Sequence, residues 1–193
     1  MGRASRHPDR DLSPLSPDAL HGRTTVVTYL EMTAPPDGPA PSVPSLLVEV
    51  RRAGRPTVSF YRYLYDSVGG PWTWVARRFL DDEALRAEIQ DPAIELQVLW
   101  SDGVPAGYIE LDFRQPANVE ILYFGLIPEF IGQGLGRFLL AWGVRRAWSR
   151  QPRRLWVHTC DLDHPGALGL YQRAGFRIFD RRVEPVLPAL PGT

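Results

Sequence analysis

Lysine is absent from this sequence, so all 22 of its basic residues are arginines. They are balanced by 22 acidic residues, and the zero net charge gives no indication of a nucleic-acid or membrane partner. The single cysteine, Cys160, has no partner for an internal disulfide, which suits a reducing compartment. No apolar run approaches the ~20 residues of a membrane-spanning helix, and the first residues lack the apolar segment of a secretory signal. We therefore expect a cytoplasmic protein.

The remaining composition is typical of one globular domain. Hydrophobic residues make up 44% of the chain and charged residues 23%. A length of 193 residues suffices for one compact domain with a full core but not for two ordinary ones. Residues 1–22, rich in Arg, Ser, Pro and Asp, predict a disordered tail. We expect a single domain over residues 23–184, followed by an irregular tail over residues 185–193.

Periodicity and turn residues predict the order of elements in this domain. Strands are expected at residues 24–30, 46–50, 94–100, 107–113, 119–127, 155–160 and 176–183. Helices are expected at residues 57–68, at 134–148, at 165–174 with Pro165 in the first turn, and from Asp81 or Asp82 to Ile89. The order is helices, an antiparallel meander, then alternating helix and strand. This order predicts an α/β or α+β sandwich.

The most informative segment joins the strand at 119–127 to the helix at 134–148. Gly132, Gly134 and Gly136 occupy alternate positions there, which lets the backbone approach a ligand and present its N–H groups. Together with the positive end of the following helix, these groups would form a cradle for phosphate. The alternative is an ordinary strand–helix turn that happens to contain glycine.

The residues around the loop exclude two common phosphate motifs. A Walker loop needs Lys and Ser or Thr after its last glycine, where Arg137 and Phe138 stand, and a dinucleotide fingerprint needs glycine where Leu139 stands. Arginines are frequent and acids absent between residues 130 and 160, which favours a polyphosphate, although arginines near a helix C-terminus also complement its dipole. The arginines concerned are Arg137, Arg145, Arg146, Arg150, Arg153 and Arg154.

Two motifs make residues 93–182 resemble the GNAT N-acetyltransferases. Leu126-Ile127-Pro128, followed by Ile131-Gly132-Gln133-Gly134-Leu135-Gly136, resembles the family's V-x-P element and Q/R-x-x-G-x-G/A loop. The run from Ala167 to Phe176 resembles its A-x-x-L-Y-x-x-x-G-F ending. Ile131 departs from the Gln or Arg that opens the loop, and His164 stands where the family often has Asn. The resemblance covers about half of the chain.

The resemblance implies a central mixed, mostly antiparallel, twisted sheet flanked by helices. It also implies direct transfer of an acetyl group from acetyl-CoA, the co-substrate, to a primary amine, with no metal. The residues that it assigns to acetyl-CoA are Leu126, Ile127, Gly132, Gln133, Gly134, Leu135, Gly136, Arg137 and His164. A non-catalytic acyl-CoA-binding or sensor domain of the same fold is the alternative.

The resemblance also suggests two catalytic residues. Tyr171 matches the family's phenol that protonates the departing thiolate, and its alternative role is core packing. Glu120 lies on the strand before the loop, where some members place a catalytic glutamate. Strand alternation predicts that Glu120 shares a face with the apolar residues Leu122, Phe124 and Leu126, and burial there would suit a general base. The alternatives are an exposed strand-end carboxylate and a water chain that carries the proton.

Aromatic residues concentrate between residues 60 and 79, where families of this kind build the acceptor site. They would line a pocket for a small amine or pack the core. No acidic run suggests a polybasic peptide, so we expect a small-molecule amine acceptor, and a homodimer is compatible with the fold. A zinc site from His158, Cys160 and His164 matches no usual ligand spacing and is not expected. The aromatic residues are Phe60, Tyr61, Tyr63, Tyr65, Trp72, Trp74 and Phe79.

Overall fold

The computed structural model describes residues 22–39, 42–44 and 47–186. The predicted tails lie almost wholly outside the described residues, as does Leu46 of the second predicted strand. The strands are β1 (Thr24–Met32), β2 (Val48–Arg52), β3 (Ile94–Ser101), β4 (Val104–Asp112), β5 (Asn118–Leu126), β6 (Arg154–Cys160) and β7 (Arg177–Pro185). The helices are α1 (Val58–Gly69), α2 (Asp82–Ile89), α3 (Leu135–Trp148) and α4 (Ala167–Arg173).

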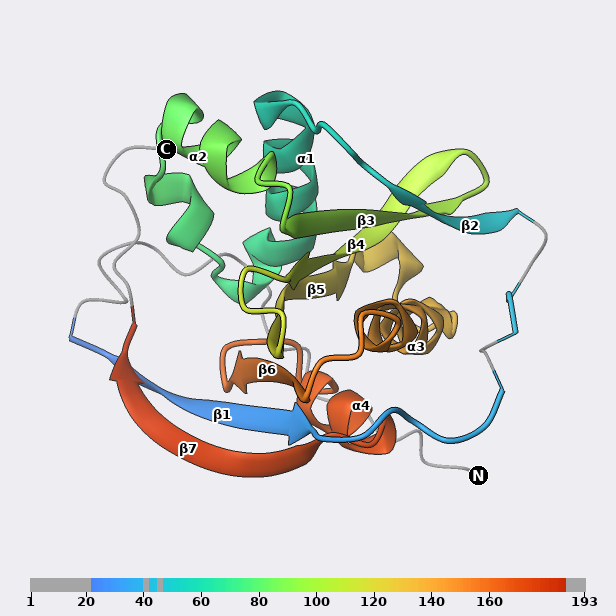
Figure 1. Ribbon diagram of the computed structural model, residues 1–193. Coiled ribbons are helices and arrows are strands. Elements are labelled where there is room, and N and C mark those ends of the chain that lie inside the picture. Colours follow the sequence, from blue (N-terminus) through green and yellow to red (C-terminus); the bar gives the residue numbers. More distant parts are fainter. Residues whose placement is uncertain (1–21, 40–41, 45–46, 187–193) are drawn as a thin grey trace, which may run out of the picture.

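All of these strands belong to one sheet, in the order β2-β3-β4-β5-β6-β1-β7. Among the described strands, β5 and β6 form the parallel pair and every other neighbouring pair is antiparallel. The predicted mixed, mostly antiparallel sheet is therefore confirmed. β1 comes first in the chain but lies between β6 and β7, where it pairs with both, and Figure 1 shows it beside β7. β7 ends at Pro185, one position beyond the predicted domain end at residue 184.

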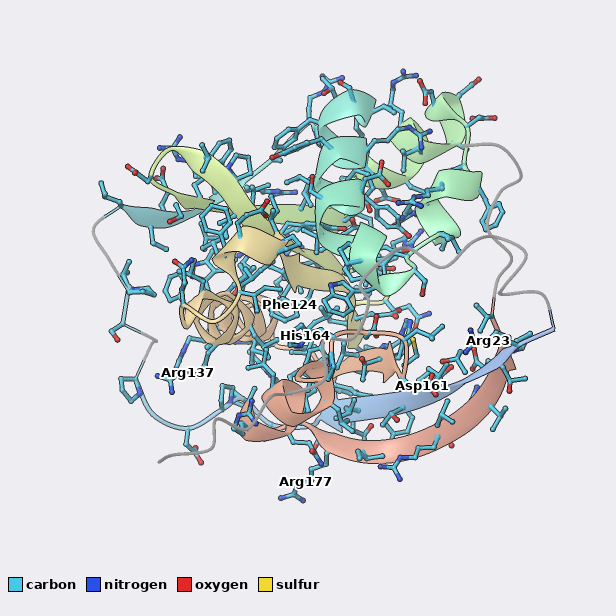
Figure 2. All side chains as sticks on the ribbon, turned by 180° about the vertical axis from the view of Figure 1, so that it is seen from behind. Arg23, Phe124, Arg137, Asp161, His164 and Arg177 are labelled. Carbon is cyan, nitrogen blue, oxygen red and sulfur yellow. The ribbon has the colours of Figure 1, made fainter. Side chains whose placement is uncertain are left out.

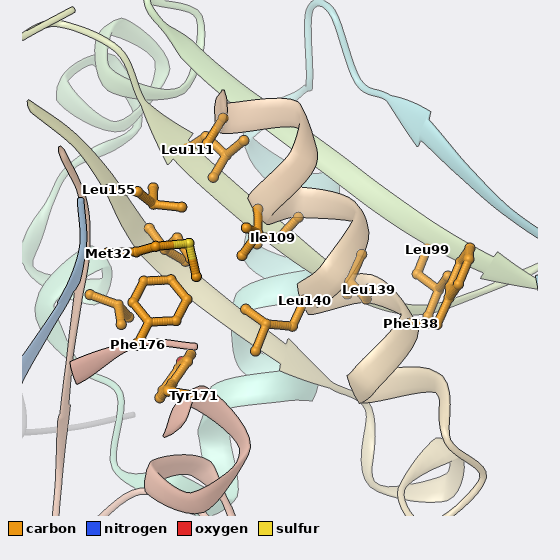
Figure 3. Packing of buried hydrophobic residues seen from close by; sticks show 14 of the residues in the cluster. Met32, Leu99, Ile109, Leu111, Phe138, Leu139, Leu140, Leu155, Tyr171 and Phe176 are labelled. Carbon is orange, nitrogen blue, oxygen red and sulfur yellow. The ribbon is translucent and has the colours of Figure 1, made fainter. Parts of the chain in front are cut away.

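Helices cover both faces of the sheet (Figure 1). α1 and α2 pack on one face, where Leu64 and Leu85 contact a core that includes Leu96 and Val98 of β3. α3 and α4 pack on the other face, and Figure 3 shows Ile109 of β4 against α3. A Cβ at Gly143 of α3 would lie 2.4 Å from Ile109, so this helix approaches the sheet as closely as glycine permits. None of the helices within the described ranges is long and apolar enough to cross a membrane.

The helix starts follow from local capping. Thr57 accepts a hydrogen bond from the N–H of Phe60 at the start of α1, and Asp81 accepts one from Ala84 at the start of α2. α4 differs from the prediction because it begins at Ala167 and not at Pro165. The reason is a turn in which the N–H of Gly166 donates to Nδ1 of His164 at 2.9 Å, which keeps these residues out of the helix.

One buried tyrosine yields a stability prediction. The side chain of Tyr108 is fully buried, and its hydroxyl has no hydrogen-bond partner among the described residues. Because an unpaired buried hydroxyl costs about 1–3 kcal/mol, we expect Tyr108→Phe to raise the free energy of unfolding by about 1 kcal/mol. The melting temperature, followed by circular dichroism, should rise by about 2–4 °C.

A neighbouring tyrosine is the matched control for this prediction. Tyr61 is equally buried, but its hydroxyl donates a 2.7 Å hydrogen bond to the buried carboxylate of Glu110. Tyr61→Phe is expected to lower the free energy of unfolding by about 1.5–3 kcal/mol, because a charged acceptor loses its donor. A loss of stability in Tyr108→Phe would contradict the reading of its hydroxyl as unpaired.

Candidate active site

The parallel strands β5 and β6 separate before they end. They pair only from Asn118 with Arg154 to Ile121 with Val157, although β5 continues to Leu126 and β6 to Cys160. A cavity of about 660 Å³ fills the resulting gap and is lined by the diverging ends of both strands. The gap therefore exposes strand edges that an extended ligand can contact.

Backbone groups of β5 point into this gap. The N–H of Ile127 donates to the carbonyl of Ala106 on the β4 side at 2.9 Å. Because N–H groups alternate in direction along a strand, the N–H of Leu126 points away from β4 and toward the gap. Leu126 also lines the cavity with its side chain. Both the backbone N–H and the side chain of Leu126 are therefore available to a ligand in the gap.

A β-bulge in β5 overturns the predicted placement of Glu120. Its register with β4 shifts between Ile121 and Tyr123, so Leu122 is an extra residue. Ile121 before the bulge and Phe124 after it therefore pack on the same α3-facing core, and simple alternation fails. Glu120 lies on the opposite face from Phe124, contrary to the sequence prediction. It is also absent from the cavity wall.

The glycine loop forms one end of the cavity, lined by Gly132, Gly134 and Gly136. Gly132 and Gly134 have φ values of +88° and +79°, and a Cβ on either would meet no atom within 4 Å. α3 starts here with no side-chain cap, unlike α1 and α2, and with no acidic residue in its first turn, unlike α2. Its first N–H groups consequently have no acceptor among the described residues. Uncapped donors at the positive end of a helix suit a phosphate.

Two arginines flank the same end. Arg137 of α3 and Arg173 of α4 both line the cavity, and neither pairs with a carboxylate among the described residues. Figure 2 shows Arg137 beside the first turns of α3. These guanidinium groups add positive charge to the donors of the loop, which favours a polyphosphate over a neutral ligand.

Other arginines of the predicted cationic run point elsewhere. Arg146 of α3 and Arg150 in the turn after this helix form ion pairs with Glu95 of β3 at 2.7 and 2.5 Å. Arg154 pairs with Glu31 at 2.6 Å. The prediction that the whole run supports polyphosphate binding was therefore wrong for these residues. These ion pairs link α3 and the turn after it to β3, and they link β6 to β1.

Tyr171 and His164 occupy the wall between the two ends of the cavity. Tyr171 is 5% exposed, and its ring packs 6.0 Å from the rings of Phe124 and Phe176. Its hydroxyl has no partner among the described residues and is not enclosed by protein, so it opens to the cavity. Burial raises the pKa of this phenol above its ordinary value. His164, labelled with Phe124 in Figure 2, accepts a backbone hydrogen bond at Nδ1, which leaves Nε2 as its N–H donor.

Three predicted cofactor residues lie outside the cavity wall. Ile127 is 8% exposed in the core beneath α1, and Leu135 is buried in the core beneath α3. The side chain of Gln133 donates to the carbonyl of Glu129 at 3.0 Å. At these positions only the backbone remains available to a ligand in the loop.

Two tryptophans after α1 line the cavity. Nε1 of Trp74 donates to the carboxylate of Asp163 at 3.1 Å, and the ring of Trp72 meets that of His164 edge to face at 5.0 Å. These contacts connect the segment after α1 to the loop between β6 and α4. The two tryptophans thereby form part of the wall of an open cleft beside the separated strands.

The aromatic cluster predicted from the sequence divides between pocket and core. Tyr65, Trp72 and Trp74 line the cavity, whereas Tyr61 is fully buried in the core. Phe60 stacks on Trp100, and Tyr63 and Phe79 are exposed. Part of the cluster thus lines the cavity and part packs in the core, and binding of an amine by these rings stays a prediction.

The far end of the cavity contains residues that the sequence motifs did not identify. Tyr29 of β1, His158 of β6 and Glu184 of β7 line it. The hydroxyl of Tyr29 donates to Glu184 at 2.6 Å, and Nδ1 of His158 lies 3.4 Å from a carboxylate oxygen of Glu120. No group of three or more potential metal ligands occurs among the residues that the structure describes. Glu120 and Glu184 place two carboxylates near this end, and neither forms an ion pair with an arginine among the described residues. The guanidinium of Arg182, which pairs with Asp180, lies 4.9 Å from the centre of the Tyr29 ring.

Comparison with known proteins agrees with this architecture. The profile of the Acetyltransferase (GNAT) family matches residues 50–176. The mycothiol acetyltransferase of Salinispora arenicola (strain CNS-205) is 37% identical over 99 residues, which are 50% of this chain and 31% of that protein. A putative [ribosomal protein bS18]-alanine N-acetyltransferase of Bacillus subtilis (strain 168) is 30% identical over 121 residues, 61% of this chain and 72% of that one.

Solved structures share the fold at low sequence identity. A GCN5-related N-acetyltransferase from Sphaerobacter thermophilus superposes with a TM-score of 0.62 at 21% identity, covering 86% of this chain and 53% of that one. A GNAT family acetyltransferase from Elizabethkingia anophelis with acetyl-CoA bound gives 0.53 at 22% identity, covering 70% and 80%. The chain thus spans about a third of the first relative and about half of the first structure. The family profile covers most of the sheet and both motifs, and on that evidence the chain belongs to the GNAT acetyltransferase family.

Proposed function

We propose that the protein transfers an acetyl group directly from acetyl-CoA to a primary amine. The observation that carries this proposal is the continuity of one cavity. It runs from the uncapped start of α3, along the separated strands and past the hydroxyl of Tyr171, to the end lined by Glu184. A phosphate-bearing donor and a cationic acceptor have opposite charges, and the cavity offers complementary charge at its two ends.

The described residues fit acetyl-CoA as a substrate. The backbone N–H groups from Gly132 to Arg137 would hold the pyrophosphate, with Arg137 and Arg173 supplying charge. The pantetheine arm would extend along the free edge of β5. His164 would donate from Nε2 to this arm in place of the family's asparagine amide.

The chemistry requires one new bond and one broken bond. The acceptor nitrogen attacks the thioester carbonyl carbon, the C–S bond breaks, and the amine loses a proton. The N–H of Leu126, aimed into the gap, would stabilise the negative oxygen of the tetrahedral intermediate. Tyr171 would donate its proton to the departing thiolate.

We further propose a small-molecule amine as the acceptor. The tryptophans Trp72 and Trp74 in the cavity wall support this choice, because concave sites lined by aromatic side chains are typical of small-molecule binding. One relative is named for mycothiol, a small molecule, and the other for the alanine of a ribosomal protein. A protein N-terminus is therefore the second candidate. The cytoplasmic location and a homodimer stay predictions.

The test is release of CoA thiol by the purified full chain with acetyl-CoA and a panel of acceptors. The panel contains glycinamide, benzylamine, 1,4-diaminobutane and a decapeptide beginning with alanine. Turnover of a small amine with kcat/KM at least about tenfold above that of the peptide supports the proposal. Preference for the peptide assigns the protein-terminus function. Binding of acetyl-CoA by calorimetry without transfer to any acceptor identifies the non-catalytic sensor.

A further inference from the structure

Glu120 and His158 are neighbouring titratable groups, of which one is a shielded carboxylate and the other an imidazole that reaches the cavity. Glu120 has a side chain that is 16% exposed and does not line the cavity, so it lacks direct access to an acceptor. His158, on the neighbouring strand β6, is 46% exposed and lines the cavity at the same end as Glu184. Nδ1 of His158 lies 3.4 Å from Oε1 of Glu120, which leaves Nε2 to meet a ligand.

The ring of His158 is held by its neighbours. Tyr29 of β1 and Trp156 of β6 flank it, with ring centroids at 5.9 and 6.2 Å. These rings limit rotation of the imidazole and keep Nδ1 turned to Glu120. A carboxylate that fixes the orientation and tautomer of an imidazole makes the other nitrogen a better proton acceptor.

We propose that His158 is the general base of the acetyl transfer and that Glu120 is its positioning residue. This inference rests on the proposed function. As the C–N bond forms and the C–S bond breaks, the proton of the acceptor nitrogen moves to Nε2 of His158. Tyr171 gives its own proton to the thiolate. The imidazolium releases the proton to solvent through its exposed edge, and the Tyr171 phenolate takes one back, so that amide and free thiol are the net products.

The charges around His158 determine its pH dependence. The groups that face it are Glu120 of β5, Asp163 of the loop after β6, Glu184 of β7 and the phenol of Tyr29. Their combined effect, led by Glu120, raises the pKa of His158 above its ordinary value and outweighs the partial desolvation of the ring by its neighbours. A base acts in its neutral form, so activity should fall as the pH drops through this pKa. Removing the charge of Glu120 should lower the pKa and move the fall to lower pH.

The experiment uses the full chain, saturating acetyl-CoA and glycinamide as the probe acceptor from pH 6 to 10. His158→Gln is expected to lower kcat about a hundredfold at pH 7.5 and to leave the Kd of acetyl-CoA unchanged. Glu120→Gln should shift the acidic limb to lower pH, and NMR titration of the His158 ring should show the same shift. Imidazole added to His158→Ala should restore part of the rate.

Glu31→Gln is the matched control. Glu31 of β1 lies on the same face of the sheet as His158, but it pairs with Arg154 and does not line the cavity. Its pH profile should equal that of the wild type. The inference is overturned if His158→Gln has the kcat of the wild type, or if Glu120→Gln leaves the acidic limb of the pH profile at the same pH. Neither result would contradict the proposed acetyl transfer itself. If no variant, wild type included, acetylates any acceptor of the panel, the proposed function fails and this inference fails with it.

Discussion

Replacing Gly134 by aspartate is expected to weaken acetyl-CoA binding about a thousandfold, equivalent to about 4 kcal/mol. Gly134 is the N-cap residue of α3 at a φ of +79°, and its missing side chain leaves the first N–H groups of the helix open. An aspartate there would accept hydrogen bonds from those N–H groups and add a negative charge where a pyrophosphate is expected. Both effects oppose binding of the phosphates. Calorimetric titration with acetyl-CoA, CoA and ATP measures them.

Gly103→Asp separates loss of binding from loss of stability. Gly103 has a φ of +80° in the turn between β3 and β4, and a Cβ there would also meet no atom within 4 Å. The two substitutions therefore cost similar backbone strain, but Gly103 does not line the cavity. Gly103→Asp should bind acetyl-CoA like the wild type. Equal affinity for acetyl-CoA in both variants would show that the phosphates do not bind at the glycine loop. Binding of ATP but not of acetyl-CoA would show that the ligand is a nucleotide and not an acyl-CoA.

Local signals in the sequence identified most elements of the fold. The caps of α1 and α2, the strand alternation and the glycine loop depend on neighbours within a few residues, and they predicted these elements to within a few positions. The place of β1 between β6 and β7 depends on contacts more than 120 residues apart, such as Leu30 with Val157. No local pattern encodes such a pairing. The start of α4 was missed because a hydrogen bond to His164 competes with the helical turn that Pro165 favours.

The residues of the candidate site also divide into those that local sequence motifs identify and those that depend on long-range pairing. Residues of the two motifs, such as Gly134 of the loop and Tyr171 of α4, line the same cavity, and their roles stay predictions. Glu120 was assigned to the wrong face because one extra residue in β5 reverses alternation, and β-bulges leave no reliable mark in a sequence. Tyr29 and Glu184 reach the cavity only because β1 pairs with β6 and β7 pairs with β1. The end of the cavity proposed to hold the acceptor thus depends on long-range pairing, whereas the end proposed to hold the phosphates is formed largely by one contiguous loop.

Tyr171→Phe is expected to lower kcat about a thousandfold while the Kd of acetyl-CoA stays the same. The hydroxyl opens to the cavity and has no partner among the described residues, so its loss breaks no internal hydrogen bond. The ring contacts with Phe124 and Phe176 persist in phenylalanine. Burial raises the pKa of the phenol, which keeps it protonated at neutral pH. The same apolar surroundings raise the pKa of a departing thiolate, so the two remain matched for proton transfer.

Tyr108→Phe is the control for this substitution, since Tyr108 is also a buried tyrosine with an unpaired hydroxyl but does not line the cavity. Steady-state rates with acetyl-CoA and glycinamide should be unchanged in this variant. The acid must be protonated to act, so the raised pKa of Tyr171 predicts that kcat holds up to a pH above the ordinary tyrosine value of about 10. In Tyr171→Phe that alkaline limb should be absent. Equal kcat values for Tyr171→Phe and the wild type would assign Tyr171 to core packing and leave the thiolate to be protonated by solvent.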